Sequence, residues 1–392
     1  MKKAIAIIGS GTMAVAISEV ASRSGIESHC FSNDKNAVVI GRCTEHHLIN
    51  IFDIERIVNV CKGIGVSGVI ATTELTVAIA SRISKLLKLN GMPLFIAEHV
   101  TNKGFVRDRV DESCGISQPK HKVIKNRNDI SIDPLSFPVI VKPTSLGGKR
   151  GILVAKNQDE YVYAINYAYE NMPKDRQEII VEEYLDGGRE FSIESLSYHG
   201  KHKVIQVTEK IISAPPHIVE LGHLQPARIT ASQRKRIEEA MPKLLDMVGI
   251  DNTSTHTEIK IINDRLYLIE LNSRPGGDNI AYRLTELSTG FSYLGGAIDI
   301  ALNNFKFPND EDLDKNTSGL VYVTSQTEYM KNIFERCDSY DWCIEKHKIS
   351  DELKEIVTNS SWNTNYMIFK SSSGIPAELK KFYLDIDIID NY

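Results

Sequence analysis

Residues 256–274 read HTEIKIINDRLYLIELNSR, two apolar-rich segments around the turn formers Asn263 and Asp264. This pattern predicts a β-hairpin, and the loop that we expect is the three residues 263–265. Because side chains alternate between the two faces of a strand, that register brings four polar groups to one end of one hairpin face. The expected cross-strand pairs are Glu258 with Glu270 and His256 with Asn272.

The two opposed glutamates of this hairpin predict a metal site. Like charges directly opposite each other destabilise a hairpin unless something compensates, and a divalent cation does so. Carboxylate and amide oxygens without cysteine suit a hard ion, Mg²⁺ in particular, which completes its shell with phosphates and water. The predicted metal ligands are Glu258, Glu270 and Asn272. The alternative is a solvated polar face on an edge hairpin, which a register shift of one residue would favour.

A second motif, FPVIVKPTSLGGKRG at residues 137–151, places Lys142 at the end of an apolar strand and before a glycine-rich loop. The backbone N–H groups of such a loop approach phosphate oxygens closely, and the lysine supplies a positive charge. The motif therefore suggests a phosphate site, although ordinary surface loops are also rich in glycine.

A third motif is VEEYLDGGRE at residues 181–190, where a strand carrying Glu182 ends in a short loop that leads to Glu190. A strand-to-loop connection offers backbone donors and acceptors to the edge of an adenine, and an acidic side chain can accept ribose hydroxyls. An acidic surface loop is the alternative interpretation.

The composition is that of a globular protein of 392 residues, long enough for two or three domains. A formal net charge of -5 gives no basic excess, which argues against nucleic acid as a partner. The six cysteines show no CxxC spacing, so we expect reduced thiols in a cytoplasmic protein. The apolar run before Gly9 is too short for a secretion signal, and no stretch approaches the roughly 20 apolar residues of a membrane span.

Three regions are predicted, in a fold of class α/β with an α+β C-terminal half. Residues 1–96 alternate strands and helices as a doubly wound parallel sheet does. Residues 97–315 include a small βαβ-like lid at about 120–182 and a β-rich part. Residues 316–392 form a mixed α/β segment that completes the C-terminal domain. Strands are expected in the first region at 28–31, 37–40 and 68–71, after the initial strand.

The N-terminal turn GSGTMA, residues 9–14, also fits the GxGxxA pattern of dinucleotide-binding domains, with Asp34 at a suitable distance. A nicotinamide-dependent dehydrogenase is therefore a rival enzyme class. It does not explain the carboxylate hairpin.

Together, in this order and spacing, the three motifs resemble the ATP-grasp superfamily over roughly residues 1–300. The resemblance implies ATP and Mg²⁺, or Mn²⁺ in its place, as cofactors. Lys103, in TNKGFVRDR, and Lys142 would contact phosphates, and Arg274 would face an acyl phosphate, which makes Arg274 and Lys142 the expected catalytic residues. The nucleotide site that the resemblance implies comprises Lys103, Lys142, Gly147, Gly148, Lys149, Gly151, Glu182, Glu183, Leu185 and Glu190.

Within that superfamily, HTEIK followed by ELNSRPGGD is most similar to the branch of L-amino-acid ligases and carnosine-synthase-like enzymes. The resemblance implies ATP-dependent amide formation between a small-molecule carboxylate and an amine through an acyl phosphate, with amino acids as expected substrates. Purine-pathway and biotin-carboxylase-like enzymes share the fold and remain alternatives, as does a nucleotide sensor without turnover. No membrane or nucleic acid is expected as a partner, and a homodimer is common among relatives. The expected substrate residues are Glu220, His223, Arg228, His256, Arg274, Gly276 and Gly277.

Overall fold

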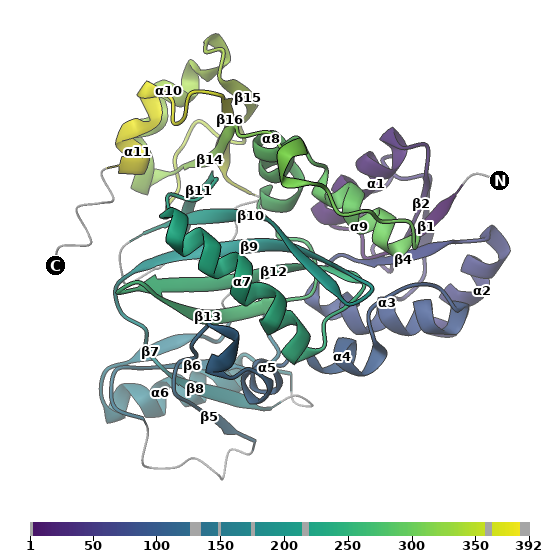
Figure 1. Ribbon diagram of the computed structural model, residues 1–392, viewed down its shortest axis with the longest axis horizontal. Coiled ribbons are helices and arrows are strands. Elements are labelled where there is room, and N and C mark those ends of the chain that lie inside the picture. Colours follow the sequence, from purple (N-terminus) through teal and green to yellow (C-terminus); the bar gives the residue numbers. More distant parts are fainter. Residues whose placement is uncertain are drawn as a thin grey trace.

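A computed structural model describes residues 3–125, 135–147, 150–173, 177–213, 219–356 and 363–384. Its three sheets lie in an N-terminal domain, a small lid and a large central unit that the C-terminal segment extends (Figure 1). Within these described ranges, no helix combines the length and the apolar character needed to cross a membrane.

The N-terminal domain is a parallel four-stranded sheet in the order β3-β2-β1-β4. Its apolar strands are buried between helices on both faces, as expected for a doubly wound sheet. The strands are β1 (Ala4–Ile8), β2 (Glu27–Ser32), β3 (Glu45–Leu48) and β4 (Gly68–Ala71), and the helices are α1 (Thr12–Arg23), α2 (Ile54–Ile64), α3 (Glu74–Leu87) and α4 (Leu94–His99).

The strand predicted at 37–40 is wrong, because that segment forms turns. Val39 is buried there and joins the core beside α1, while Val38 and Ile40 are exposed. The third strand is instead β3, whose sequence EHHL contains a single apolar residue. Hydrophobicity could not identify this edge strand.

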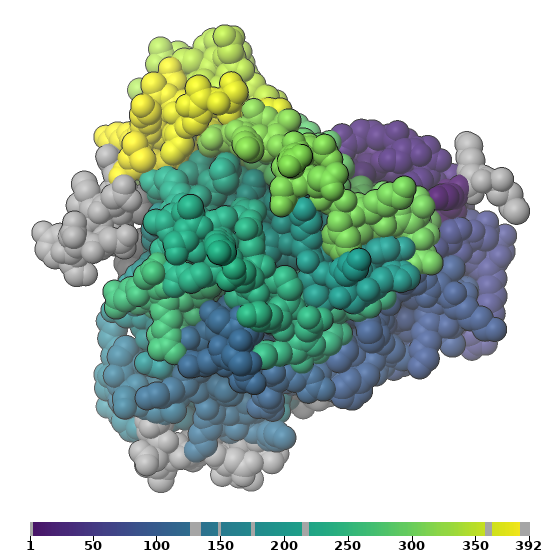
Figure 2. Space-filling model, viewed as in Figure 1, coloured from purple at the N-terminus to yellow at the C-terminus, as the bar shows by residue number. Residues whose placement is uncertain are grey.

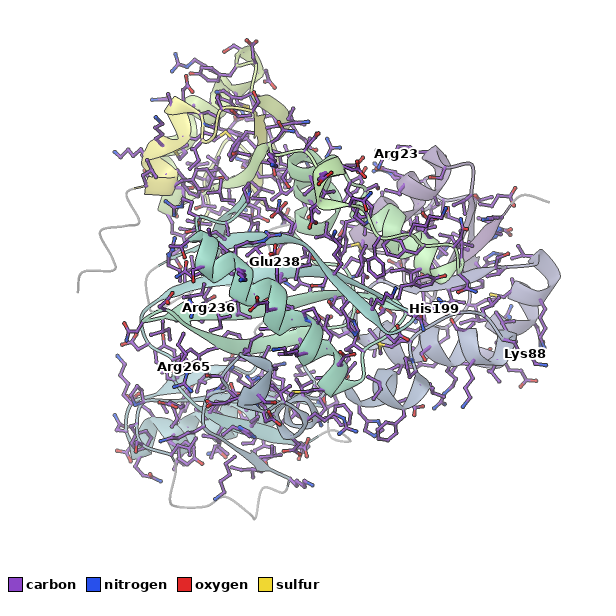
Figure 3. All side chains as sticks on the ribbon, viewed as in Figure 1. Arg23, Lys88, His199, Arg236, Glu238 and Arg265 are labelled. Carbon is purple, nitrogen blue, oxygen red and sulfur yellow. The ribbon has the colours of Figure 1, made fainter. Side chains whose placement is uncertain are left out.

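The central sheet has eight antiparallel strands in the order β13-β12-β9-β10-β11-β14-β16-β15. Helix α7 (Ala231–Val248) crosses one face of it (Figure 1) and buries Ile237, Met241 and Leu244 against the sheet. On α7, Arg236 donates to the Asp264 carbonyl at 2.7 Å, which ties the helix to the hairpin turn near Arg265 (Figure 3). The strands are β9 (Arg189–Tyr198), β10 (Lys201–Ile212), β11 (Glu220–Gln225), β12 (Thr253–Ile262), β13 (Arg265–Asn272), β14 (Thr317–Val323), β15 (Cys343–His347) and β16 (Asn365–Ser371).

The helices α8 (Thr285–Thr289) and α9 (Tyr293–Ala301) connect the central sheet to the N-terminal domain. Helix α9 packs against α1 and β4, and its Leu294 and Ile298 share one core with apolar residues of both domains. The central sheet and the first domain are therefore held together by buried apolar surface.

The lid is a four-stranded antiparallel sheet, β5-β8-β6-β7, covered by α6 (Gln158–Glu170). The predicted βαβ-like arrangement is present, because β7 and β8 are each antiparallel to β6, which lies between them, and are therefore parallel to each other with α6 connecting them. Its strands are β5 (His121–Ile124), β6 (Val139–Pro143), β7 (Leu153–Ala155) and β8 (Ile179–Glu183).

The C-terminal segment adds β14, β15 and β16 to the central sheet, with α10 (Lys331–Glu335) and α11 (Lys380–Leu384) packed on it. Its core contains Phe334, Phe369 and Phe382, all nearly fully buried. In the space-filling view this segment sits at the end of the molecule opposite the lid (Figure 2).

Candidate active site

The hairpin β12–β13 pairs Glu258 with Glu270 and His256 with Asn272, as predicted. The loop, however, has two residues, not three, because Ile262 pairs with Arg265. Its residues Asn263 and Asp264 both have positive φ, as a tight primed turn requires. A β-bulge next to Glu258 then adds one residue on β13 and restores the predicted partners of the glutamates.

Each glutamate of the pair has its own lysine. The Lys210 ammonium lies 2.6 Å from Glu258, and that of Lys103 lies 2.9 Å from Glu270. Burial would raise the pKa of Glu258, but the Lys210 and His256 charges outweigh burial and hold this pKa well below its usual range. Glu258 is therefore a carboxylate at neutral pH, the form that binds a cation.

His256 connects this pair to a buried third carboxylate. One ring nitrogen of His256 lies 2.5 Å from Glu194 and the other 3.3 Å from Glu258. Burial would lower the pKa of His256, but Glu194 and Glu258 raise it to about 9. The Gly276 N–H also reaches Glu194, at 3.3 Å, and a Cβ at Gly276 would lie 2.6 Å from the His256 ring. A side chain at position 276 would collide with the His256 ring, so this position needs glycine.

The donor set fits Mg²⁺. Glu258, Glu270 and Asn272 offer carboxylate and amide oxygens from paired or nearby strand positions, and the side chains of both glutamates keep about a quarter of their surface exposed, at 25% and 26%. Hard cations prefer such oxygens. The ammonium groups of Lys103 and Lys210 lie at the same face and offset the negative charges of the two glutamates.

Lys142 lies in a buried ion triad at the base of the lid. Its ammonium is 2.6 Å from Glu182, which also accepts from Arg107 Nε at 2.8 Å. Burial would raise the pKa of Glu182, but Arg107 and Lys142 lower it to about 2. Arg107 further donates to the Ile269 carbonyl at 2.9 Å, so the triad links the lid to α5 (Lys103–Arg109) and the hairpin.

Lys103 joins three parts of the predicted nucleotide site. It is the first residue of α5, and its ammonium contacts Glu270 and donates to the Leu146 carbonyl at 3.1 Å. The loop after β6 is thereby drawn to the hairpin. Gly147 lies in this loop near Glu74, and Gly151, with φ 70°, packs beside Pro143. Gly148 and Lys149 lie outside the described residues.

The predicted adenine and ribose residues meet at Lys260. This lysine, on β12, donates to the Leu185 carbonyl at 2.8 Å and lies 3.9 Å from Glu190. The Glu183 N–H is occupied by the Lys120 carbonyl at 2.8 Å. Glu182 lies on β8, the strand between β5 and β6. Its side chain belongs to the ion triad, whereas the sequence motif suggested adenine recognition by backbone groups.

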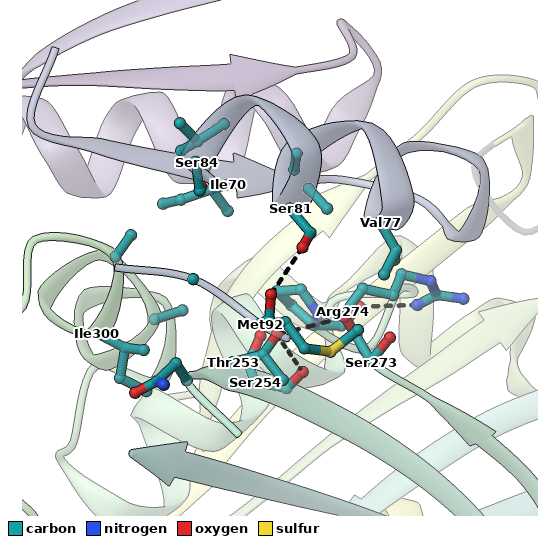
Figure 4. A pocket seen from close by; sticks show the side chains of 18 residues that line it. Ile70, Val77, Ser81, Ser84, Met92, Thr253, Ser254, Ser273, Arg274 and Ile300 are labelled. Carbon is teal, nitrogen blue, oxygen red and sulfur yellow. Dashed lines mark hydrogen bonds between the residues drawn. The ribbon is translucent and has the colours of Figure 1, made fainter. Parts of the chain in front are cut away.

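Arg274 leaves the hairpin toward the N-terminal domain. Its guanidinium forms an ion pair with Glu74 at the start of α3, with Nε at 3.0 Å from that carboxylate. Burial acts to raise the pKa of Glu74, and Arg274 lowers it below its usual value. Arg274 also borders a small cavity between α3 and the hairpin (Figure 4). Val77, Met92 and Ser254 line the same cavity.

Of the predicted substrate residues, Glu220 and His223 lie together, whereas Arg228 lies elsewhere. His223 lies 3.4 Å from Glu220, which is 3.2 Å from the Lys210 ammonium, and with Asp278 they form one cluster. His223 is fully buried, and neither ring nitrogen has a hydrogen-bond partner among the described residues.

Arg228 instead binds Glu209, at 2.8 Å. Because Glu209 precedes Lys210 on β10, these two point to opposite faces of the sheet. At Gly277, a Cβ would face open space.

Five residues of the site were absent from the sequence prediction: Glu74, Arg107, Glu194, Lys210 and Lys260. The period of two along β9 and β10 could have placed Glu194 and Lys210 on the hairpin's face only if the strand order were known. Glu74 comes from the N-terminal domain and Arg107 from the separate helix α5, and their spacing carries no signal.

The model of the ATP-grasp domain family matches residues 135–282. The chain contains an ATP-grasp domain. The match covers the lid from β6 onward and the whole hairpin, including every predicted metal ligand. Over the whole length, the fold is that of ATP-grasp proteins, with a parallel N-terminal sheet and antiparallel sheets in the later domains.

Several known proteins are similar to this chain. Alanine–anticapsin ligase of Bacillus subtilis (strain 168) is 28% identical over 251 residues, which are 58% of this chain and 52% of that enzyme. The crystal structure of L-amino acid ligase from Bacillus licheniformis superposes with a TM-score of 0.79 at 20% identity, covering 99% of this chain and 97% of the other. The biotin carboxylase domain of Hydrogenobacter thermophilus 2-oxoglutarate carboxylase, solved with MgADP and bicarbonate, gives 0.71 at 17% identity, covering 95% and 87%.

The sequence match to the ligase of Bacillus subtilis spans about half the length of that relative. The structural likenesses include enzymes of different reactions, so they define the fold, and the activity has to be argued from the site.

Proposed function

We propose that this chain is an ATP-dependent ligase that joins a carboxylate to an amine, with amino acids as substrates. The proposal rests on one observation above all. The paired Glu258 and Glu270 lie on the same hairpin end as Arg274 and within reach of two lysines, Lys103 and Lys210. Sequence similarity to alanine–anticapsin ligase supports the choice of an amide-forming ligase within the superfamily.

The residues that would hold Mg²⁺ are Glu258, Glu270 and Asn272, and the bound ion would neutralise charge on the phosphates of ATP. Lys103 would bind phosphate at the mouth of the loop after β6, because its ammonium already spans that loop and the hairpin. Lys142 would add a second positive charge from β6, on a scaffold that Glu182 and Arg107 fix.

In the reaction that we propose, an oxygen of the substrate carboxylate attacks the γ-phosphorus of ATP, and ADP leaves. The amine then attacks the acyl carbon, and phosphate leaves as the amide forms. Arg274, held by Glu74, would present its guanidinium to the oxyanion that develops on the acyl group. The lid would exclude water, since water hydrolyses an acyl phosphate.

The acidic cluster of Glu220, His223 and Asp278 supports recognition of an ammonium group. It lies beside Glu258, with Lys210 between Glu220 and Glu258. Burial is the main reason that the pKa of His223 is lowered, so the ring is neutral and can accept a hydrogen bond. An amino-acid substrate carries the ammonium donor that such acceptors bind.

ADP release from ATP and Mg²⁺, measured across amino acids offered singly and in pairs, tests this function. We expect turnover only with particular pairs, formation of a dipeptide by mass spectrometry, and loss of turnover in Glu270→Gln. Lys142→Ala should raise the ATP concentration needed for half-maximal rate.

Bicarbonate, offered alone and with biotin, is the control for a carboxylase. ATP cleavage that requires bicarbonate and no amino acid would overturn the ligase proposal in favour of the carboxylating alternative. ATP cleavage absent under every condition, with ATP still bound, would overturn it in favour of a nucleotide sensor.

A further inference from the structure

A cluster of histidines lies on the N-terminal sheet, at the edge opposite the strand that leads to the active site. β3 is one edge of that sheet, and the other edge is β4, which leads into α3 and Glu74. The cluster therefore belongs to none of the nucleotide, metal or substrate positions described above.

Three of its side chains converge. His29 on β2 pairs in register with Glu45 on β3, and His47 follows two residues later on the same face. The facing ring nitrogens of His29 and His47 are 3.1 Å apart, and each ring lies 3.8 Å from a Glu45 carboxylate oxygen. One potential ligand atom from each residue can be chosen so that all three lie within 4.8 Å of one another.

The spacing of the two imidazoles matches metal coordination. Two nitrogens bound to one tetrahedral zinc, each at 2.0–2.1 Å from it, are about 3.3 Å apart. Two His and one Glu are also a known zinc-ligand set, which leaves a fourth position for water.

The surroundings hold the two imidazole rings in place. The His47 ring stacks on Phe31, with ring centroids 4.7 Å apart, and His29 is buried. The second ring nitrogen of His29 is buried without a hydrogen-bond partner among the described residues.

We infer that His29, Glu45 and His47 bind one divalent transition-metal ion, with zinc as the expected occupant. Glu45 is the exposed member, with 60% of its side chain accessible, and gives the ion its entry from solvent. Imidazole nitrogens select zinc over Mg²⁺, so this site and the carboxylate hairpin would take different ions.

His46 offers a matched control on the same strand. Its ring lies on the other face of the sheet, where it contacts the Ser32 hydroxyl at 2.9 Å. Replacement of His46 therefore changes the same local sequence without touching the cluster. Glu45→Gln and His47→Gln alter the ligands. Because Glu45 is exposed, Glu45→Gln should leave folding intact.

The test is equilibrium dialysis of the full chain against Zn²⁺ with Mg²⁺ in large excess, with metal content measured by elemental analysis. One zinc per chain is expected for the wild type and for His46→Gln, and Glu45→Gln and His47→Gln should each lose about tenfold or more in affinity. Co²⁺ bound in place of zinc should give visible absorption bands that both ligand variants weaken.

Less than one zinc per chain in the wild type would overturn the site. So would equal zinc affinity of the His47→Gln and His46→Gln variants, provided that circular dichroism shows both to be folded. Because no nucleotide or amino acid is present, the result does not depend on the proposed ligase activity.

Discussion

Replacing Glu182 by glutamine tests the buried ion triad. Glu182 is 1% exposed and is the shared partner of Lys142 and Arg107, which are themselves buried. Glutamine keeps the shape of the side chain but removes its charge. Two positive groups would then lie side by side without a counter-ion, which is far more costly than losing an exposed ion pair.

The magnitude follows from two independent arguments. The depression of the Glu182 pKa from 4.5 to about 2 corresponds, at about 1.4 kcal/mol per pKa unit, to about 3 kcal/mol of stabilisation of the charged form. Removal of one partner from a buried ion pair typically costs about 3–5 kcal/mol. We therefore expect Glu182→Gln to lower the free energy of unfolding by about 3–5 kcal/mol at pH 7.

Urea unfolding of the full chain at pH 7, followed by circular dichroism and by a probe in the lid, measures this loss. Glu183→Gln is the control, because Glu183 is the next residue on the same strand and is exposed, so its replacement should cost less than about 0.5 kcal/mol. A difference of less than about 1 kcal/mol between the two variants would refute the triad as a determinant of stability.

Four further perturbations have defined outcomes. Glu270→Gln should reduce Mg²⁺-dependent ADP release at least tenfold while thermal unfolding in Mg²⁺-free buffer changes little, because charge is lost and shape is kept; equal loss of both would point to a structural role. Lys210→Met should lower the melting temperature in Mg²⁺-free buffer, since it leaves Glu258 without its ammonium, and added Mg²⁺ should raise that temperature more in the variant than in the wild type; equal rises would contradict the assignment. Gly276→Ala should cost about 1–3 kcal/mol in chemical denaturation, because the added methyl meets the His256 ring. The free energy of unfolding should be larger for the wild type than for His256→Gln below pH 6.5, by at most about 3 kcal/mol, and this difference should disappear as the pH rises through about 9. The reason is that the pKa of His256 is raised in the folded state, and urea unfolding at several pH values measures the effect.

The amino-acid sequence was sufficient for the parts of the fold that local chemistry determines. The apolar runs of β1 and β4 and the helical period of α7 predicted those elements correctly. It failed at β3, where EHHL pairs with β2 although only one of its residues is apolar. The pairing of β3 depends on a neighbouring strand that is distant in sequence, so no local pattern reports it.

The hairpin shows how a correct pairing can follow from an incorrect turn. The prediction of Glu258 opposite Glu270 assumed a three-residue loop, whereas the chain uses a two-residue turn and a bulge. Both solutions satisfy the same constraint, that the two glutamates share one face. The turn formers Asn263 and Asp264 favour the tighter loop, and the bulge has no recognisable sequence pattern.

The lysines beside the proposed metal ligands could not be predicted from local sequence, since Lys103 was expected only from the resemblance and Lys210 was missed. The proposed metal ligands come from one hairpin, so their spacing in the sequence reflects their geometry. The lysines that balance them, Lys103 on α5 and Lys210 on β10, come from elements that meet the hairpin only in the folded chain. Without them Glu258 and Glu270 would repel each other across the strands. In the proposed function, the same positive charges that keep the ion-free hairpin stable would be available to phosphate, and nucleotide binding would exchange the present ion pairs for pairs with Mg²⁺ and phosphate.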